Sequence, residues 1–366
     1  MIRSFFSYSR GYEGKYFPHG LLLGIRRDSQ RRLIQRIFTI SYIIFQETYL
    51  SKTINRRNKV AKILISGGAG FIGSHIAESY LASGLEVVIV DNLSTGKREN
   101  LPSGVTFYER DITSKEDMEE IFFRERPDYV NHHAAQINLR RSIEEPLFDA
   151  QVNILGSISL LELSVKYQVQ KFIFASTGGA IYGEVETLPV REDVPALPLS
   201  PYGVAKRSVE LYLNYYNKVH GLDFVALRYG NVYGPRQDPR GEAGVIAIFI
   251  SRILRGEPCI IFGDGQKTRD YVYVEDIAKA NLLALSASGI YNLGTGNETS
   301  VLDLVEILKK VSGKDFPVIF DEERKGEINR IALSSEKARK VLGWTPSISL
   351  EEGISSTWKW FKERKQ

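Results

Sequence analysis

Gly67-Gly68-Ala69-Gly70-Phe71-Ile72-Gly73 is the stretch of this sequence that decides its fold. It follows the apolar run Lys62–Ser66, which is typical of a buried parallel strand, and opens a helix predicted from Phe71 to Ser83. Its GxxGxxG spacing allows a tight turn, close approach of the backbone to a phosphate, and close packing of helix on strand. The stretch therefore predicts a dinucleotide site. The predicted contacts in it are Gly67, Gly70, Phe71, Ile72 and Gly73.

An acidic residue ends the next apolar run. Glu86–Val90 leads to Asp91, eighteen residues after Gly73. A carboxylate at this place accepts hydrogen bonds from ribose hydroxyls and repels a 2′-phosphate, which favours NAD over NADP. No arginine directly follows Asp91, although Lys97 and Arg98 are near enough in the sequence to keep a 2′-phosphate in consideration. NAD is the predicted cofactor.

Strand-like runs continue to alternate with helical periodicity along the chain. The runs are Val105–Arg110, Tyr129–His133 and Lys171–Ala175, and one of the helical segments is Asn153–Tyr167. This alternation predicts an α/β fold with a Rossmann-type, doubly wound parallel sheet. The active crevice of such a sheet lies at the carboxyl ends of its strands.

A tyrosine and a lysine share one face of a later helix. Ser200 and Pro201 are typical of an N-cap and a first turn, and the helix is predicted to run to His220 before Gly221. Tyr202 and Lys206 are four residues apart on it. A neighbouring ammonium and a positive nicotinamide favour the phenolate, so we expect the pKa of Tyr202 to lie below its ordinary value. Tyr202 is then a candidate general base.

Such a pair is usually an ordinary surface feature, but here it follows a dinucleotide turn and the hydroxyl-bearing loop Ser176-Thr177. His132 and His133, at a strand end, are expected to line or support the site rather than to catalyse.

Composition limits the other functions open to the chain. Its 366 residues, 43% hydrophobic and 25% charged, suit a soluble protein of two lobes or two domains. One cysteine, Cys259, excludes an internal disulfide and fits a reducing compartment, so we expect a cytoplasmic protein. The five histidines show no ligand spacing, and we expect no metal.

The first 59 residues differ in charge from the rest. They hold twelve Lys and Arg against three Asp and Glu, a balance of +9, which leaves −5 for residues 60–366. The body therefore gives no reason to expect nucleic acid. The apolar run Ile37–Phe45 is too short to span a bilayer and lacks a secretory cleavage site after it. A wrongly assigned start, an organelle-type presequence, and an amphipathic arm on a membrane or partner remain open.

Taken together, these motifs resemble those of the extended short-chain dehydrogenase/reductases, specifically the nucleotide-sugar epimerases of the UDP-glucose 4-epimerase type. The likeness runs from about Ile63 to Trp360. It implies an NAD-binding lobe of residues 60–228 with 272–291, a smaller substrate lobe of 229–271 with 292–366, and a homodimer with a helix pair at its interface. Residues 1–59 would form a basic extension.

The resemblance also assigns roles to particular residues. Asn231 would bind a UDP-sugar substrate, Arg269 and Arg324 would clamp its two phosphates, and segments 242–245, which include Val245, and 261–262 would line the uracil and ribose pocket. Pocket width near Ile331 would decide between a 2-hydroxyl and a 2-acetamido sugar. The further cofactor contacts would be Asn92, Asp111, Ile112, Ala134, Ala135, Gln136, Asn153, Tyr202, Lys206 and Tyr229.

The implied reaction is reversible oxidation at the sugar C4. Tyr202 would remove the proton of the 4-hydroxyl while the hydride passes to NAD, and the transient 4-keto sugar would rotate and take the hydride back on its other face. Related enzymes carry a catalytic Ser or Thr four residues before the tyrosine of a Tyr-Gly pair, but Gly178 stands there in this chain. Thr177 is therefore the predicted hydroxyl, with Ser176 as the alternative.

Other activities share this fold and remain to be weighed. A nucleotide-sugar 4,6-dehydratase needs an acid/base couple where this chain has Gly179 and Ala180. A UDP-glucuronate epimerase or decarboxylase stays open. A non-enzymatic NAD-sensing scaffold has no need of Tyr202, Lys206, Arg269 and Arg324 together.

Overall fold

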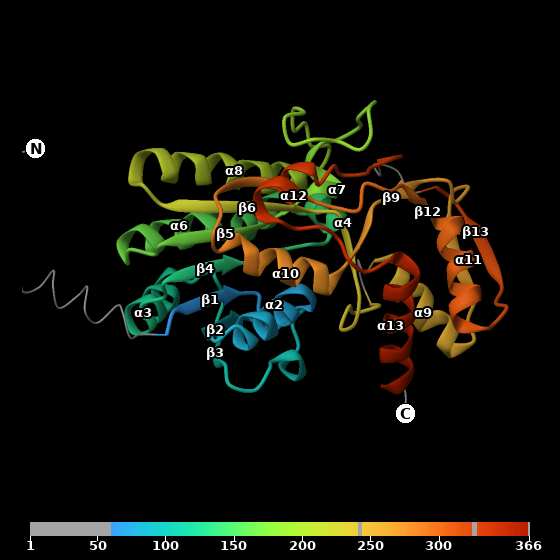
Figure 1. The fold of residues 1–366 in the computed structure, drawn as a ribbon, viewed down its shortest axis with the longest axis horizontal. Coiled ribbons are helices and arrows are strands. Elements are labelled where there is room, and N and C mark those ends of the chain that lie inside the picture. Colours follow the sequence, from blue (N-terminus) through green and yellow to red (C-terminus); the bar gives the residue numbers. More distant parts are fainter. Residues whose placement is uncertain (1–59, 241–243, 324–327, 365–366) are drawn as a thin grey trace, which may run out of the picture. The chain divides into compact units, whose positions relative to one another are not determined.

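A computed structural model describes residues 60–240, 244–323 and 328–364. Their centre is a parallel sheet of seven strands in the order β11-β6-β5-β4-β1-β2-β3 (Figure 1). The strands are β1 (Lys62–Ser66), β2 (Glu86–Asp91), β3 (Thr106–Glu109), β4 (Tyr129–His132), β5 (Lys171–Thr177), β6 (Asp223–Tyr229) and β11 (Gly289–Leu293). The strand order reverses between β1 and β4, which confirms the doubly wound fold and places the crevice at their carboxyl ends.

Helices cover both faces of this sheet. They are α2 (Phe71–Ala82), α3 (Lys115–Glu125), α4 (Leu139–Glu144), α5 (Pro146–Ala150), α6 (Gly156–Lys166), α8 (Pro201–His220) and α10 (Val274–Ala284). Ile63 and Ile65 of β1 pack with the α2 side chains, while Leu64 packs with those of α3 and α6 on the other face. This alternation along one strand buries both faces, as parallel strands require.

A second, smaller group of elements has a core of its own. It contains α9 (Val245–Arg255), α11 (Val301–Ser312), α13 (Leu350–Glu363) and β8 (Cys259–Phe262), which pairs with β13 (Val318–Asp321). Short pairs β7 (Asn231–Tyr233) with β10 (Tyr271–Tyr273), and β9 (Thr268–Arg269) with β12 (Thr299–Ser300), connect it to the sheet strands. Helix α12 (Glu336–Leu342) packs against β11, beside the sheet.

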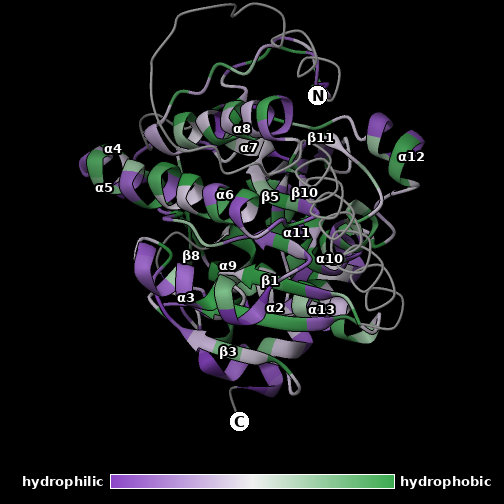
Figure 2. Cartoon of the chain, turned by 90° about the vertical axis from the view of Figure 1, so that its left-hand side faces the viewer, coloured by the Kyte–Doolittle hydropathy of each residue, from purple (hydrophilic) through white to green (hydrophobic). Residues whose placement is uncertain are grey.

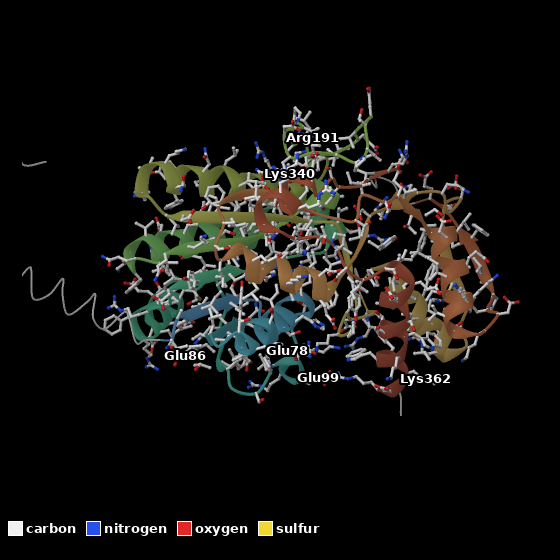
Figure 3. The ribbon with its side chains drawn as sticks, viewed as in Figure 1. Glu78, Glu86, Glu99, Arg191, Lys340 and Lys362 are labelled. Atoms are coloured by element: carbon white, nitrogen blue, oxygen red, sulfur yellow. The ribbon has the colours of Figure 1, made fainter. Side chains whose placement is uncertain are left out.

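Hydropathy and charge follow the layers. Figure 2 shows hydrophilic and hydrophobic residues alternating along α6 and α8, which expose one face and bury the other. Charged side chains such as Glu78, Glu99 and Arg191 project at the periphery (Figure 3). No helix among the described residues has the length and apolarity needed to cross a bilayer.

Two predicted elements differ from the structure near the site. The segment predicted as one helix from Asn153 begins as a π-helical turn, Gln151–Leu155, and becomes α-helical only at Gly156. Strand β5 extends past Ala175, so that Ser176 and Thr177 belong to the strand and pair with Arg228 and Tyr229 of β6. Strand pairing, rather than a loop, therefore fixes the backbone of Ser176 and Thr177.

Candidate active site

The glycine turn at the end of β1 leaves no room for side chains. Gly67 has a φ of +73°, and a Cβ on it would lie 2.5 Å from the backbone nitrogen of Ala134. A Cβ on Gly73 would overlap the carbonyl oxygen of Gly67. Helix α2 starts at Phe71 with no side-chain cap and no acidic residue in its first turn. Its first N–H groups are therefore suited to an anion such as a pyrophosphate.

Asp91 lies directly beside this turn. Its Oδ2 accepts a hydrogen bond from the Ala69 N–H at 3.0 Å, and its Oδ1 accepts one from the Leu93 N–H at 2.9 Å. Burial raises the pKa of this carboxyl, and the two N–H donors oppose that rise. Next to it, the Asn92 side-chain amide donates to Asp111 Oδ2 at 2.7 Å. The acidic residue and the glycine turn thus form one cradle that fits a dinucleotide.

The two cations near Asp91 are engaged elsewhere. Lys97 Nζ lies 3.1 Å from Asp238 Oδ2, and Arg98 pairs with Glu109. Each cation thus has a carboxylate partner, and the Asp91 carboxylate is the feature that favours a cofactor without a 2′-phosphate.

The loop after β4 and the π-helical turn are joined by their amide groups. The Gln136 N–H donates to Asn153 Oδ1, and Asn153 Nδ2 donates to the Gln136 carbonyl, both at 2.9 Å. Ala134 is tied to the end of β1 through its N–H, which donates to the Ser66 carbonyl at 2.9 Å. Hydrogen bonds therefore hold Gln136 to Asn153, and Ala134 to the carboxyl end of β1.

Helix α8 carries the candidate base, and its predicted ends are confirmed. Ser200 Oγ accepts a hydrogen bond from the Gly203 N–H at 3.2 Å, and Gly221 ends the helix at a φ of +72°. Lys206 is 4% exposed, donates from Nζ to the Ala175 carbonyl at 2.9 Å, and lies 5.8 Å from the centre of the Tyr202 ring. Burial lowers the pKa of Lys206 to about 8.

The lowered pKa expected for Tyr202 combined the Lys206 ammonium with a bound nicotinamide, and the protein groups alone shift this pKa in the other direction. Burial raises the pKa of Tyr202 above its ordinary value, and the negative charge of Asp149 adds to the rise. Desolvation disfavours the phenolate, and the Lys206 ammonium is not close enough to reverse that cost. The charge that favours the phenolate has to come with the ligands.

The two candidate hydroxyls at the end of β5 have different surroundings. Ser176 is buried and donates to Glu210 Oε1 at 2.8 Å. Thr177 lines a cavity and makes no hydrogen bond through its side chain within the described residues. A Cβ on Gly178 would overlap Cδ1 of Leu333, so the space for a side chain at that position is already filled. Thr177 is therefore the hydroxyl available to a ligand.

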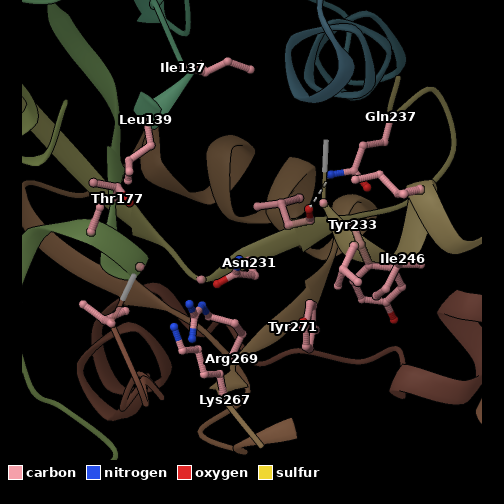
Figure 4. Close-up of a pocket in the computed structure, with 18 of the residues that line it drawn as sticks. Ile137, Leu139, Thr177, Asn231, Tyr233, Gln237, Ile246, Lys267, Arg269 and Tyr271 are labelled. Atoms are coloured by element: carbon pink, nitrogen blue, oxygen red, sulfur yellow. Dashed lines mark hydrogen bonds between the residues drawn. The ribbon is translucent and has the colours of Figure 1, made fainter. Parts of the chain in front are cut away.

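The cavity holding Thr177 has a volume of about 690 Å³ and includes Tyr202, Tyr229 and Val245 in its wall. In Figure 4 the cationic ends of Lys267 and Arg269 point toward Asn231. Arg324 and residues 242 and 243 of the predicted segment 242–245 lie outside the described residues. Ile331 does not line the cavity; it is 1% exposed and packs with Tyr182, Val190 and Leu333.

Two buried carboxylates near the site were missed from the sequence. Glu210 follows Lys206 by one helical turn and binds Arg228 through two hydrogen bonds, at 2.8 and 2.7 Å. Asp149 lies on α5 and accepts hydrogen bonds from Gln136 and Asn153. For Glu210, a charge on the buried face of α8 was the available signal. No pattern in the sequence near Asp149 indicated that this residue is buried.

Comparisons with known proteins agree with this geometry. Residues 63–294 match the model of the NAD dependent epimerase/dehydratase family. The UDP-glucose 4-epimerase of Mycolicibacterium smegmatis is 41% identical over 313 residues, covering 83% of this chain and 100% of that protein.

Two solved structures are similar over nearly their whole length. The Thermotoga maritima UDP-glucose 4-epimerase with UDP-glucose is 50% identical, with a TM-score of 0.82, and the match covers 83% of this chain and 100% of that one. The Thermus thermophilus UDP-glucose 4-epimerase with NAD is 47% identical, with a TM-score of 0.80 and coverage of 82% and 99%. The chain belongs to the NAD-dependent epimerase/dehydratase family and, as its motifs indicate, to the extended short-chain dehydrogenase/reductases of the UDP-glucose 4-epimerase type.

Proposed function

We propose that this protein is an enzyme that uses NAD to interconvert UDP-glucose and UDP-galactose by epimerisation at C4. One feature carries the proposal. A single cavity of about 690 Å³ holds Tyr202 and Thr177 at the sheet edge together with Asn231 and Arg269 from the smaller group of elements. A sugar that carries a diphosphate can contact both sets of residues at once, with its sugar at Tyr202 and Thr177 and its phosphates at Arg269.

The chemistry assigned to the side chains is a reversible proton transfer. Tyr202 takes the proton from the 4-hydroxyl and later returns it, and Thr177 donates a hydrogen bond that holds the 4-oxygen in place. Lys206 holds its ammonium beside Tyr202 through the Ala175 carbonyl. When bound at the glycine cradle, NAD supplies hydride acceptance and return at C4, and its positive ring favours the phenolate. The reaction has no net oxidation.

The substrate's phosphates are assigned to Arg269 and Arg324, with Asn231 beside them. A guanidinium grips phosphate oxygens in pairs through its fixed fork of donors. Lys267 adds a further positive group on the same side of the cavity (Figure 4). Val245 and the apolar start of α9 are assigned to the uracil and ribose end.

Incubation with single sugars tests the proposal. We expect the purified protein to convert UDP-glucose to UDP-galactose, as measured by sugar analysis of the product. UDP-N-acetylglucosamine and UDP-glucuronate serve as parallel substrates. Turnover of UDP-glucuronate alone would replace the proposed substrate, a 4-keto-6-deoxy product would indicate a dehydratase, and no turnover with NAD still bound would indicate the sensing scaffold.

Mutation distinguishes the role of Thr177 from that of Ser176. We expect Thr177→Val to lower kcat clearly more than Ser176→Ala, because only Thr177 faces the cavity with an unengaged hydroxyl. The measurement is kcat on UDP-glucose for both variants, after circular dichroism has established that both are folded. The reverse order would assign the catalytic role to Ser176.

The identity of the cofactor is tested by extraction. We expect denatured, freshly purified protein to release NAD and no NADP, because Asp91 borders the glycine cradle and Lys97 and Arg98 are paired with Asp238 and Glu109. Mass spectrometry of the extract gives the answer. NADP in the extract would contradict this assignment.

We also propose a homodimer, a cytoplasmic location and the two-lobe division at residues 228/229, 271/272 and 291/292. Large apolar side chains exposed along α8 support the homodimer: Val204, Leu211, Tyr212, Tyr215 and Val219. The place of β11 in the sheet and the separate core around α9 and α11 support the division. Sedimentation of the holoenzyme tests the oligomeric state.

A further inference from the structure

Asp149 is a buried carboxylate to which the chemistry above gives no part. It lies on α5, is 1% exposed, and makes no ion pair within the part of the chain that the structure describes. Burying a charge without a partner costs several kcal/mol unless hydrogen bonds and a nearby opposite charge compensate. Its surroundings therefore show what the charge acts on.

Neutral groups hold this carboxylate in one position. Asp149 Oδ1 accepts hydrogen bonds from Gln136 Nε2 at 3.0 Å and from Asn153 Nδ2 at 2.9 Å. Gln136 is fixed in turn, because its Oε1 accepts from the Asn138 N–H at 2.6 Å and its Nε2 donates to the Asn138 carbonyl at 2.9 Å. Amide donors orient a carboxylate but leave its charge in place.

Asp149 lies on a helix that packs against α8, and α8 carries both Tyr202 and Lys206. Asp149 raises the pKa of both Lys206 and Tyr202. Lys206 Nζ has the Ala175 carbonyl at 2.9 Å and the Phe174 ring at 4.8 Å as neighbours, and neither carries a charge. The negative charge of Asp149 offsets part of the cost of burying the Lys206 ammonium.

Other titratable groups around α5 do not replace it. His132 and His133, at the end of β4, have pKa values held below the ordinary value by burial and stay neutral. On α4, Arg141 pairs with Glu145 at the surface, and Arg140 and Glu144 are exposed. On α8, Glu210 pairs with Arg207 and with Arg228. The α8 groups whose pKa values respond to Asp149 are Tyr202 and Lys206.

We propose that Asp149 is a positioning residue that acts through Lys206 and sets the pH range over which the Tyr202–Lys206 pair exchanges its proton. The inference rests on the proposed function, in which Tyr202 is the base. A fixed negative charge beside the pair favours the states in which both groups keep their protons. The pair can then return a proton to the 4-oxygen as readily as it removed one.

The test is Asp149→Asn in the full-length holoenzyme, because an amide keeps the shape and removes the charge. Without the negative charge both Tyr202 and Lys206 lose their protons more easily, so the rising limb of kcat against pH moves to lower pH by about one unit. Asp149→Ser, which also removes the charge, moves it in the same direction. Asp149→Glu, which keeps the charge, leaves the limb close to that of the unmodified protein.

A second measurement does not depend on turnover. Ionisation of Tyr202 is followed by the ultraviolet absorbance of the phenolate, with the Tyr202→Phe protein subtracted in each background. The midpoint falls in Asp149→Asn and in Asp149→Ser. This titration answers the question even if no UDP-hexose is converted, so failure of the proposed function and failure of this inference are distinguishable.

Asp276→Asn is the matched control. Asp276 is equally buried, on α10, and accepts hydrogen bonds from Ser347 and Ile348, away from the cavity. This variant loses stability, but its rising limb of kcat against pH and the midpoint of its Tyr202 titration stay those of the unmodified protein. An Asp149→Asn protein with an unshifted limb and midpoint would overturn the proposal, whatever its kcat.

Discussion

Tyr202→Phe is expected to lower kcat at least about a hundredfold while NAD remains bound, the magnitude usual for loss of a general base. The hydroxyl is the group that takes and returns the proton of the 4-oxygen in the proposed reaction. The ring stays in place, because Tyr202 occupies the first turn of α8, whose cap and close packing at Gly203 do not involve the hydroxyl. Steady-state turnover of UDP-glucose and the extracted NAD content measure the two effects.

Tyr215→Phe is the matched control. Tyr215 lies on the same helix but is 48% exposed and contacts Tyr216 and His220. Its variant should retain full turnover in the dimer and bind NAD normally. Unchanged turnover in Tyr202→Phe would remove Tyr202 from the reaction and with it the proposed mechanism.

Glu210→Gln is expected to lower the free energy of unfolding by about 3–5 kcal/mol, the range for breaking a buried ion pair from one side. Glu210 accepts hydrogen bonds from Arg228, Ser176 and Arg207. The variant leaves the Arg228 guanidinium buried without its counter-charge, because the glutamine amide keeps one acceptor oxygen and replaces the other by an NH2 donor. The Tyr182 hydroxyl, at 2.7 Å, is also neutral. Urea denaturation of the holoenzyme at fixed NAD concentration measures the change.

Two comparisons separate this effect from ordinary loss of charge. Glu120→Gln removes an exposed partner of Arg124 on α3 and should change the free energy of unfolding by less than about 1 kcal/mol. The double variant Glu210→Leu with Arg228→Met should be less unstable than Glu210→Gln, because no buried charge is left unpaired. A single variant as stable as the unmodified protein would mean that water reaches the pair.

Local patterns were enough to predict much of the fold. The glycine turn, the end of β1 and both ends of α8 depend on residues that are neighbours in the sequence, and the predicted and observed ends of α8 agree. Asp91 reaches the turn through the pairing of β2 with β1, and it was predicted because an acidic residue at this spacing is part of the dinucleotide pattern.

Other features depend on residues far apart in the chain, and single-sequence patterns carry no record of them. Glu210 looks like one acid among many on α8 until Arg228 and Ser176 are placed around it. The π-helical turn that holds Asn153 packs against α8, about fifty residues further along the chain, and no local pattern in the sequence indicated it. The rise in the pKa of Tyr202 that the protein groups alone cause depends on burial and on Asp149, and the sequence pattern places neither.

The contact between Gly178 and Leu333 has a consequence for redesign. A serine at position 178, where related enzymes carry a hydroxyl, would meet the Leu333 side chain before it met a substrate. Leu333 is anchored, because its N–H donates to Asp270 at 2.9 Å and its side chain is fully buried. Positions 178 and 333 therefore have to change together. Placing the hydroxyl at position 178 instead of Thr177 takes two substitutions, a serine at 178 and a shorter side chain at 333.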